Sequence, residues 1–156
     1  MMEIEKKYLI DKIPEKLKLP NGINIEQGYL TSPEAQETIR LRKKGNKYYK
    51  TWKSKGLLIR EEKEVELNKA EYEKEWTSVL GNTIKKTRYE IPYDSHIIEL
   101  DIYHGVHNDL ITAEVEFKSI EQSELFEPPN WFGKDVTLSA EFKNSNLAFN
   151  GLPENL

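Results

Sequence analysis

The chain has 156 residues, a length that suits one domain with its own hydrophobic core, and we treat residues 1–156 as that domain. Its 23 basic and 27 acidic residues give a net charge of −4, which argues against a general nucleic-acid-binding protein because such proteins are strongly basic. The absence of cysteine excludes disulfides, thiolate metal sites and cysteine nucleophiles. The sequence shows neither a signal peptide nor an apolar run that could span a membrane, so we expect a cytoplasmic protein with no membrane partner.

Eight segments alternate with the period of a β-strand, and in seven of them one face carries ionisable residues at every second position. In the first of them, Glu3, Glu5 and Lys7 share one face, and apolar side chains occupy the other. The dipeptide Gly45-Asn46 between two of the segments predicts a tight hairpin turn. The predicted strands are 2–10, 23–30, 38–44, 47–55, 58–67, 84–91, 96–103 and 111–118.

The clearest predicted helix begins after Asn68, a good N-cap residue, and Glu71 three residues later completes a capping-box pattern. Gly81 is expected to end this helix. Its apolar stripe consists of Tyr72, Trp76, Val79 and Leu80. Two further helical segments are predicted at 119–126 and 139–149.

One face of the predicted strands collects ionisable side chains. The basic ones are Lys7, Arg40, Arg42, Lys53, Arg60, Lys86 and Arg88. The acidic ones are Glu3, Glu5, Glu62, Glu64, Glu99, Asp101, Glu114 and Glu116. An open sheet with this face in water would explain the pattern, but such a face usually mixes uncharged polar residues with its charges. We therefore favour the alternative, a small closed antiparallel barrel with a charged lumen and helices packed outside.

A charged lumen of this kind suits a polyphosphate that is bound together with a divalent cation. Charge inside a barrel is tolerated only when it is paired or bound to a ligand. Arginine side chains match phosphate oxygens in a two-pronged geometry, and lysines add point charge. Carboxylate clusters without histidine or cysteine select Mg²⁺ or Mn²⁺. The pattern therefore predicts a small-molecule polyphosphate as the partner, rather than a nucleic acid.

These residues resemble the motifs of the CYTH domain family, the triphosphate tunnel metalloenzymes, in the same order along residues 2–147. The matching motifs are Glu3-x-Glu5-x-Lys7, Arg40-x-Arg42, Thr51-x-Lys53, Arg60-x-Glu62-x-Glu64, Lys86-x-Arg88, Glu99-x-Asp101 and Glu114-x-Glu116, followed by segment 131–137. The resemblance implies a mainly β (α+β) fold, in which an eight-stranded antiparallel tunnel with flanking helices hydrolyses or cyclises triphosphates. Lys134 stands where short relatives often carry an acid, so we assign it no role.

Three roles are assigned on the charged face. The expected metal ligands are Glu3, Glu5, Glu114 and Glu116. The expected substrate-binding residues are Lys7, Arg40, Arg42, Lys53, Lys86 and Arg88. The expected catalytic residues are Lys7, Glu62, Glu64 and Asp101. Lys86 is preferred to its neighbour Lys85 because strand alternation places it on the same face as Arg88.

Three functions are compatible with these assignments. The favoured one is a metal-dependent triphosphatase acting on inorganic triphosphate, with nucleoside and thiamine triphosphates as further substrates. The others are an adenylate cyclase of the CYTH type, which makes cyclic AMP from ATP, and a non-catalytic polyphosphate-binding module. His96, His104 and His107 are expected at the surface rather than in catalysis. The sequence leaves a homodimer open.

Overall fold

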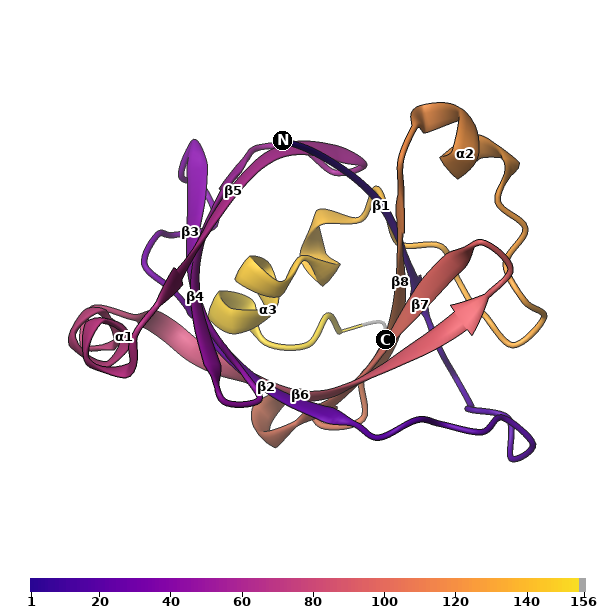
Figure 1. Ribbon diagram of the computed structural model, residues 1–156, viewed down its shortest axis with the longest axis horizontal. Coiled ribbons are helices and arrows are strands. Elements are labelled where there is room, and N and C mark those ends of the chain that lie inside the picture. The colour runs from indigo at the N-terminus through magenta and orange to yellow at the C-terminus, as the bar shows by residue number, and fades with distance from the viewer. Residues whose placement is uncertain (155–156) are drawn as a thin grey trace.

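The computed structural model describes residues 1–154 and shows eight β-strands that close into a barrel (Figure 1). The strands are β1 (Met2–Leu9), β2 (Ile23–Tyr29), β3 (Glu37–Lys44), β4 (Lys47–Ser54), β5 (Ile59–Leu67), β6 (Leu80–Tyr93), β7 (His96–His104) and β8 (Ile111–Phe117). Their order around the barrel is β1-β5-β4-β3-β2-β6-β7-β8, and every neighbouring pair is antiparallel. The predicted mainly β barrel is confirmed, and every strand except β6 begins and ends within one residue of its predicted limits.

The strand register brings distant parts of the chain to one lumen. β1 closes the barrel because it pairs on one side with β5, where Glu3 lies opposite Arg60. On its other side it pairs with β8, where Glu5 lies opposite Glu116. Since side chains alternate along each strand, fixing these pairs turns the whole charged face of each strand inward.

The predicted capping box is present at α1 (Lys69–Trp76), which lies outside the barrel (Figure 1). The Asn68 side chain accepts a hydrogen bond from the Glu71 backbone N–H, and the Glu71 carboxylate accepts one from the Asn68 N–H. These bonds satisfy two amide groups that the first turn leaves without partners. The second outer helix, α2 (Ile120–Leu125), follows Ser119 as its N-cap.

The predicted extension of α1 to Leu80 is wrong. The helix ends at Trp76, and a turn in which the Val79 amide donates to the Trp76 carbonyl leads directly into β6. Leu80 then pairs with Tyr29 of β2, beyond an irregularity in the register of the two strands. Pairing with β2 supplies hydrogen bonds that outweigh the helical pattern of the segment. Gly28 allows this approach, because a Cβ there would lie 2.6 Å from Val79.

An apolar core covers the outer faces of β1, β7 and β8. Tyr8 and Leu100 are buried in it together with Phe126, which follows α2. Phe132 packs on Tyr8 from further along the chain, with the ring centroids 4.8 Å apart. This outer core packs against one side of the barrel without using any residue of the charged face.

A second core lies inside one end of the barrel. The short turn η2 (Ala140–Phe142) and helix α3 (Asn144–Asn150) lie within the ring of strands, as the yellow segment of Figure 1 shows. Leu147 of α3 is fully buried in a cluster with Ile84 and Tyr103. The prediction that helices pack outside holds for α1 and α2 and is wrong for this segment. Its apolar side chains enter the barrel because the lumen-facing residues at this end are themselves apolar or aromatic.

The expectation of surface histidines is wrong for His107, which ends the turn η1 (Gly105–His107) and is fully buried. Its Nε2 lies within hydrogen-bonding distance of the Leu147 carbonyl of α3. His104 is exposed as predicted, and His96 is half-buried against Phe117. Within residues 1–154, no helix has the length and apolarity needed to cross a membrane.

Candidate active site

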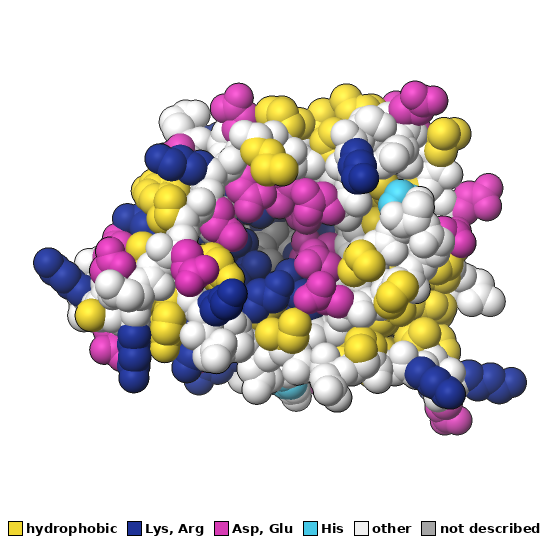
Figure 2. Space-filling view, in the orientation of Figure 1, with side chains coloured by type: hydrophobic (Ala, Val, Ile, Leu, Met, Phe, Trp, Pro, Cys, Tyr) yellow, Lys and Arg dark blue, Asp and Glu magenta, His cyan; other side chains and the backbone are white. Residues whose placement is uncertain are grey.

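The lumen of the barrel contains a cavity of about 200 Å³. Figure 2 looks into this hollow, where carboxylates gather along one side and basic side chains along the other. The predicted site residues that line it are Glu3, Glu5, Lys7, Arg40, Arg42, Lys53, Glu62, Glu64, Arg88, Glu114 and Glu116. Lys86 and Asp101 point to the same side of the sheet but do not line the cavity, because both are fully buried beside Arg88.

The acidic side of the lumen is built by β1 and β8. Burial, followed by the nearby Glu114 and Glu3 carboxylates, raises the pKa of Glu5 well above its usual value. Burial alone would also raise the pKa of Glu114, but Lys7, Lys86 and Arg88 hold it well below its usual value. Two close carboxylates whose pKa values are driven apart share one negative charge more readily than two.

A hard divalent cation fits this acidic side. Glu114 Oε1 is buried and accepts no hydrogen bond from residues 1–154, with Arg88 Nη2 3.9 Å away. A buried carboxylate oxygen without a hydrogen-bond partner, close to a second carboxylate whose pKa is raised, is a suitable ligand for a cation. Within residues 1–154, no group of three or more acidic or histidine side chains is arranged to hold a metal ion. The carboxylates would therefore have to turn toward the ion as it binds.

Glu3 joins the acidic side to the basic side. Lys53 Nζ donates to both of its carboxylate oxygens, at 3.0 and 3.2 Å, and Arg60 Nη2 lies 3.8 Å from Oε1. Burial alone would raise the pKa of Glu3, but Lys53 and then Arg60 bring it below its usual value. Burial and the neighbouring Arg40 lower the pKa of Lys53. The Glu3–Lys53 pair is thus charged in the free protein, and Lys53 also has the cationic Arg40 as a neighbour.

The basic side is provided mainly by β3. Arg40 Nη2 donates to the Thr51 hydroxyl and lies 3.9 Å from Oε2 of Glu64, whose side chain is 41% exposed. Arg42 Nε donates to the neutral Gln27 Oε1 at 2.9 Å, and Arg42 makes no ion pair within residues 1–154. Burial, Arg40 and Arg88 together lower the pKa of Arg42 to about 10. Two adjacent guanidinium groups with so little negative charge around them form a suitable site for an anion.

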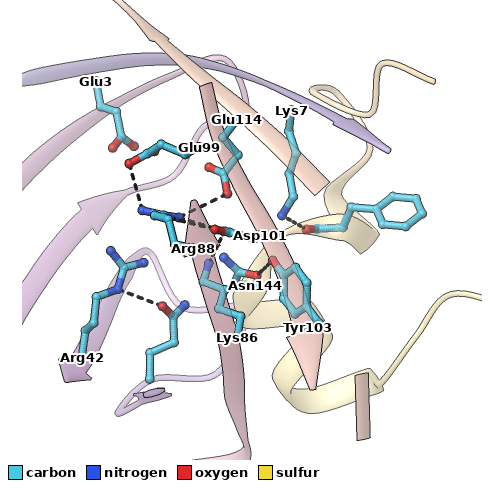
Figure 3. Close-up of polar contacts among 12 residues, drawn as sticks. Glu3, Lys7, Arg42, Lys86, Arg88, Glu99, Asp101, Tyr103, Glu114 and Asn144 are labelled. Carbon is cyan, nitrogen blue, oxygen red and sulfur yellow. Dashed lines mark hydrogen bonds and ion pairs between the residues drawn. The ribbon is translucent and has the colours of Figure 1, made fainter. Parts of the chain in front are cut away.

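A buried network lies on β6 and β7 (Figure 3). Arg88 binds Asp101 through two hydrogen bonds and Glu99 through a third at 3.0 Å. Lys86 Nζ lies 2.8 Å from Asp101 Oδ2, and burial nevertheless lowers the pKa of Lys86 to about 7. Burial alone would raise the pKa of Asp101, but Arg88 and Lys86 keep it below its usual value.

The structure adds residues that the role assignments omitted. Arg60, already on the charged face, lines the cavity next to Glu3. Lys143, which lies between η2 and α3, also lines it, and burial followed by Arg60 lowers its pKa. The signal for Arg60 was its strand alternation. Lys143 gave none, because its position depends on the C-terminal segment entering the barrel.

Lys7 has a partner that the sequence did not indicate. Its Nζ donates a hydrogen bond of 2.6 Å to the backbone carbonyl of Phe142 in η2 (Figure 3). The Lys7 ammonium group therefore links two parts of the lumen. It lowers the pKa of Glu114 on the acidic side, and it binds the C-terminal segment that lies inside the barrel.

Comparisons with known proteins agree with this geometry. The model of the CYTH domain family matches residues 1–135. The chain is 38% identical to an inorganic triphosphatase of Nitrosomonas europaea, over 95% of this chain and 97% of that protein. It is 30% identical to an inorganic triphosphatase of Acetivibrio thermocellus, over 95% of this chain and 94% of that protein. A solved structure of an inorganic triphosphatase matches with a TM-score of 0.70 and 34% identity, over 97% of each chain.

Proposed function

This chain belongs to the CYTH domain family, and on that basis we propose that it is a metal-dependent hydrolase that splits inorganic triphosphate into pyrophosphate and phosphate. The lumen carries this proposal, because cations and carboxylates face each other across one cavity of about 200 Å³. Pockets for drug-sized organic ligands are usually larger, roughly 300–1,000 Å³. The cavity therefore suits a bare triphosphate better than a nucleotide, which argues against the cyclase alternative.

The cation is assigned to Glu3, Glu5, Glu114 and Glu116, with Mg²⁺ or Mn²⁺ as the expected ion. Support comes from the oxygen-only donor set, from the raised pKa of Glu5 and from the unpartnered oxygen of Glu114. When bound, the ion offsets negative charge on the phosphate oxygens and polarises the bond to be cleaved.

The triphosphate is assigned to the basic side of the lumen. Arg40 and Arg42 provide guanidinium groups with little charge compensation, and Lys53, Arg60 and Lys143 converge on the same cavity. Lys86 and Arg88, which are also assigned to the substrate, are both bound to Asp101 in the free protein; Arg88 lines the cavity, whereas Lys86 is fully buried beside it. Fixed cations of this kind stabilise charge on the transferred phosphoryl group without having to reorganise.

Catalysis then requires a water molecule aligned with the terminal phosphorus. The water oxygen bonds to that phosphorus, the bond to the bridging oxygen breaks, and pyrophosphate leaves. Burial and Glu3 raise the pKa of Glu62, which makes its carboxylate a better proton acceptor for this water than an ordinary glutamate. Glu64 is more exposed and binds the Thr51 hydroxyl, which in turn contacts Arg40, so we assign it to positioning. Asp101 orients Arg88, and Lys7 lies beside the metal carboxylates.

Side-by-side kinetics on triphosphate, ATP and thiamine triphosphate, with Mg²⁺, Mn²⁺ or EDTA, test the proposal. We expect the highest kcat/KM for triphosphate, chromatographic release of pyrophosphate and phosphate, and no turnover in EDTA. Cyclic AMP as the main product from ATP would establish the cyclase. Binding of triphosphate without turnover under any metal would establish the non-catalytic module.

A matched pair of variants separates the lumen from the rest of the barrel. Glu5→Gln removes a lumen carboxylate, whereas Glu61→Gln removes an exposed one from β5. Glu5→Gln should abolish most turnover and Glu61→Gln should leave it unchanged. Equal activity in both variants would contradict the assignment of the lumen as the active site.

A further inference from the structure

The side chain of Asn144, in α3, is held in one orientation beside the lumen cavity. Asn144 lines the cavity and is half-buried. Its Oδ1 accepts a hydrogen bond of 2.6 Å from the hydroxyl of Tyr103, which projects from β7 (Figure 3). A side-chain amide carries its acceptor on the oxygen and two N–H donors on the nitrogen. A partner fixed on the oxygen therefore decides where the donors lie.

Tyr103 holds this amide from within the core that lies inside the barrel. Its side chain is 1% exposed and belongs to the apolar cluster that α3 completes. Burial, followed by the nearby Asp101 and Glu114 carboxylates, raises the pKa of the Tyr103 hydroxyl well above its usual value. The hydroxyl therefore keeps its proton at any working pH and donates it to Asn144 Oδ1.

The amide nitrogen of Asn144 is left for a ligand. Within residues 1–154 this nitrogen makes no hydrogen bond. Unlike the amine of Lys86, it is not one of the buried atoms that lack a partner. Because Asn144 lines the cavity, both of its N–H groups are open to a molecule that binds there.

A neutral donor suits this place because positive charge is already concentrated around it. Lys143 precedes Asn144 in the chain and lines the same cavity, and burial followed by Arg60 and Lys55 lowers its pKa. Another cation here would add to that repulsion. An amide supplies two donors without further charge, and its hydrogen bond to an anionic phosphate oxygen is stronger than one to a neutral acceptor.

We propose that Asn144 binds the triphosphate by donating from its amide nitrogen to a phosphate oxygen, and that Tyr103 is the positioning residue that directs this amide. The inference rests on the proposed function and adds two residues to the same site. The hydrogen bond forms to the bound substrate and persists in the transition state. Its loss should therefore raise KM more than it lowers kcat.

The test measures Kd for inorganic triphosphate by calorimetry in EDTA, and kcat and KM with Mg²⁺. Asn144→Ala should weaken binding about 10- to 100-fold and raise KM to a similar extent, because a hydrogen bond to a charged group is lost. Asn144→Asp keeps the shape of the side chain but replaces the donor with a negatively charged acceptor, so it should bind triphosphate more weakly still.

The matched control is Asn146→Ala, in the same helix. Asn146 Nδ2 donates to the Ala140 carbonyl at 2.8 Å, and Asn146 does not line the cavity. This variant should lower Tm and leave Kd unchanged. Equal weakening of binding by Asn144→Ala and Asn146→Ala would show that loosening of α3 is responsible, and would overturn the inference.

Tyr103→Phe tests the positioning role. Alone it should weaken binding about 2- to 10-fold, the contribution of a neutral hydrogen bond. Added to Asn144→Ala it should change Kd no further, because its effect passes through the amide. An equal effect of Tyr103→Phe in both backgrounds would refute the positioning role.

Wild-type Kd in folded Asn144→Ala would overturn the binding role of the amide. If Asn144→Ala does not fold, Asn144→Asp decides, since wild-type affinity in that variant would overturn the inference equally. Wild type that binds triphosphate without hydrolysing it would refute the proposed function, and the binding comparisons would still decide the role of Asn144.

Discussion

Arg88 and Asp101 face each other across β6 and β7 in a two-pronged ion pair, with Nε 2.8 Å from Oδ1 and Nη2 2.9 Å from Oδ2. Lys86 Nζ lies 2.8 Å from Oδ2 of the same carboxylate, and both Lys86 and Asp101 are almost completely buried. Arg42 stands in contrast, since within the described residues 1–154 its guanidinium binds only the neutral Gln27 side chain. Arginines with the same sequence pattern thus differ in their partners: Arg88 is bound to a buried carboxylate, whereas Arg42 is bound to a neutral amide, and we therefore expect Arg42 to be the more available to an anion.

Arg88→Ala should therefore destabilise the fold far more than Arg42→Ala. Removing Arg88 leaves Asp101 without its main partner, and breaking a buried pair in this way costs about 3–5 kcal/mol. Arg42→Ala should change the free energy of unfolding little and weaken triphosphate binding about 10- to 100-fold, because a charge-assisted hydrogen bond is lost. Urea unfolding and titration calorimetry measure the two effects. Equal destabilisation by both substitutions would contradict the distinction.

Glu5→Gln should stabilise the protein in the absence of metal and remove its response to Mg²⁺. The pKa of Glu5 is raised, so its contribution to stability is complete below the ordinary value of 4.5 and is lost as pH rises through the folded value. At pH 8 the neutral amide avoids that loss, and each 1 kcal/mol gained corresponds to about 2–4 °C in Tm. Thermal unfolding with EDTA and with Mg²⁺ tests both parts. A variant less stable than wild type in EDTA would show that Glu5 is not under like-charge repulsion.

Triphosphate should take up protons when it binds at pH 8 without metal. Burial lowers the pKa of Lys86 to about 7, so the amine is mostly neutral at pH 8 in the free protein. A bound anion favours the charged form and raises that pKa, which draws a proton from solution. Calorimetry in two buffers of different ionisation enthalpy measures the uptake. Lys86→Arg should abolish it, because the guanidinium is already protonated; the same uptake in that variant would assign the proton to another group.

Lys143→Ala should raise KM for triphosphate about tenfold without lowering Tm. In the free protein, burial and the nearby Arg60 disfavour the ammonium, so its removal relieves repulsion rather than breaking a contact. Lys134→Ala is the control, because Lys134 is exposed and does not line the cavity. Steady-state kinetics and thermal unfolding decide the matter. A fall in Tm with unchanged KM would show that Lys143 serves the packing of the C-terminal segment rather than the binding of substrate.

Much of the barrel could be predicted from the sequence because strand alternation is a local property. The pattern Glu3-x-Glu5-x-Lys7 places its side chains on one face whatever the rest of the chain does. Repetition of that pattern in further strands indicated a shared charged surface, and seven strand limits followed within one residue. The capping box of Asn68 and Glu71 was predictable for the same reason, since its bonds span three residues.

The remaining features depended on contacts between distant segments. Leu80 became a strand residue because β2 offers hydrogen bonds there, against the local helical pattern. Phe142 and Lys143 reached the lumen because the apolar end formed by Ile84 and Tyr103 accepts the C-terminal segment. The sequence by itself thus determined which side chains share a face. Tertiary structure alone decided which of those charges pair with each other, as Arg88 does with Asp101, and that the C-terminal segment packs inside the barrel, because both depend on the packing of residues far apart along the chain.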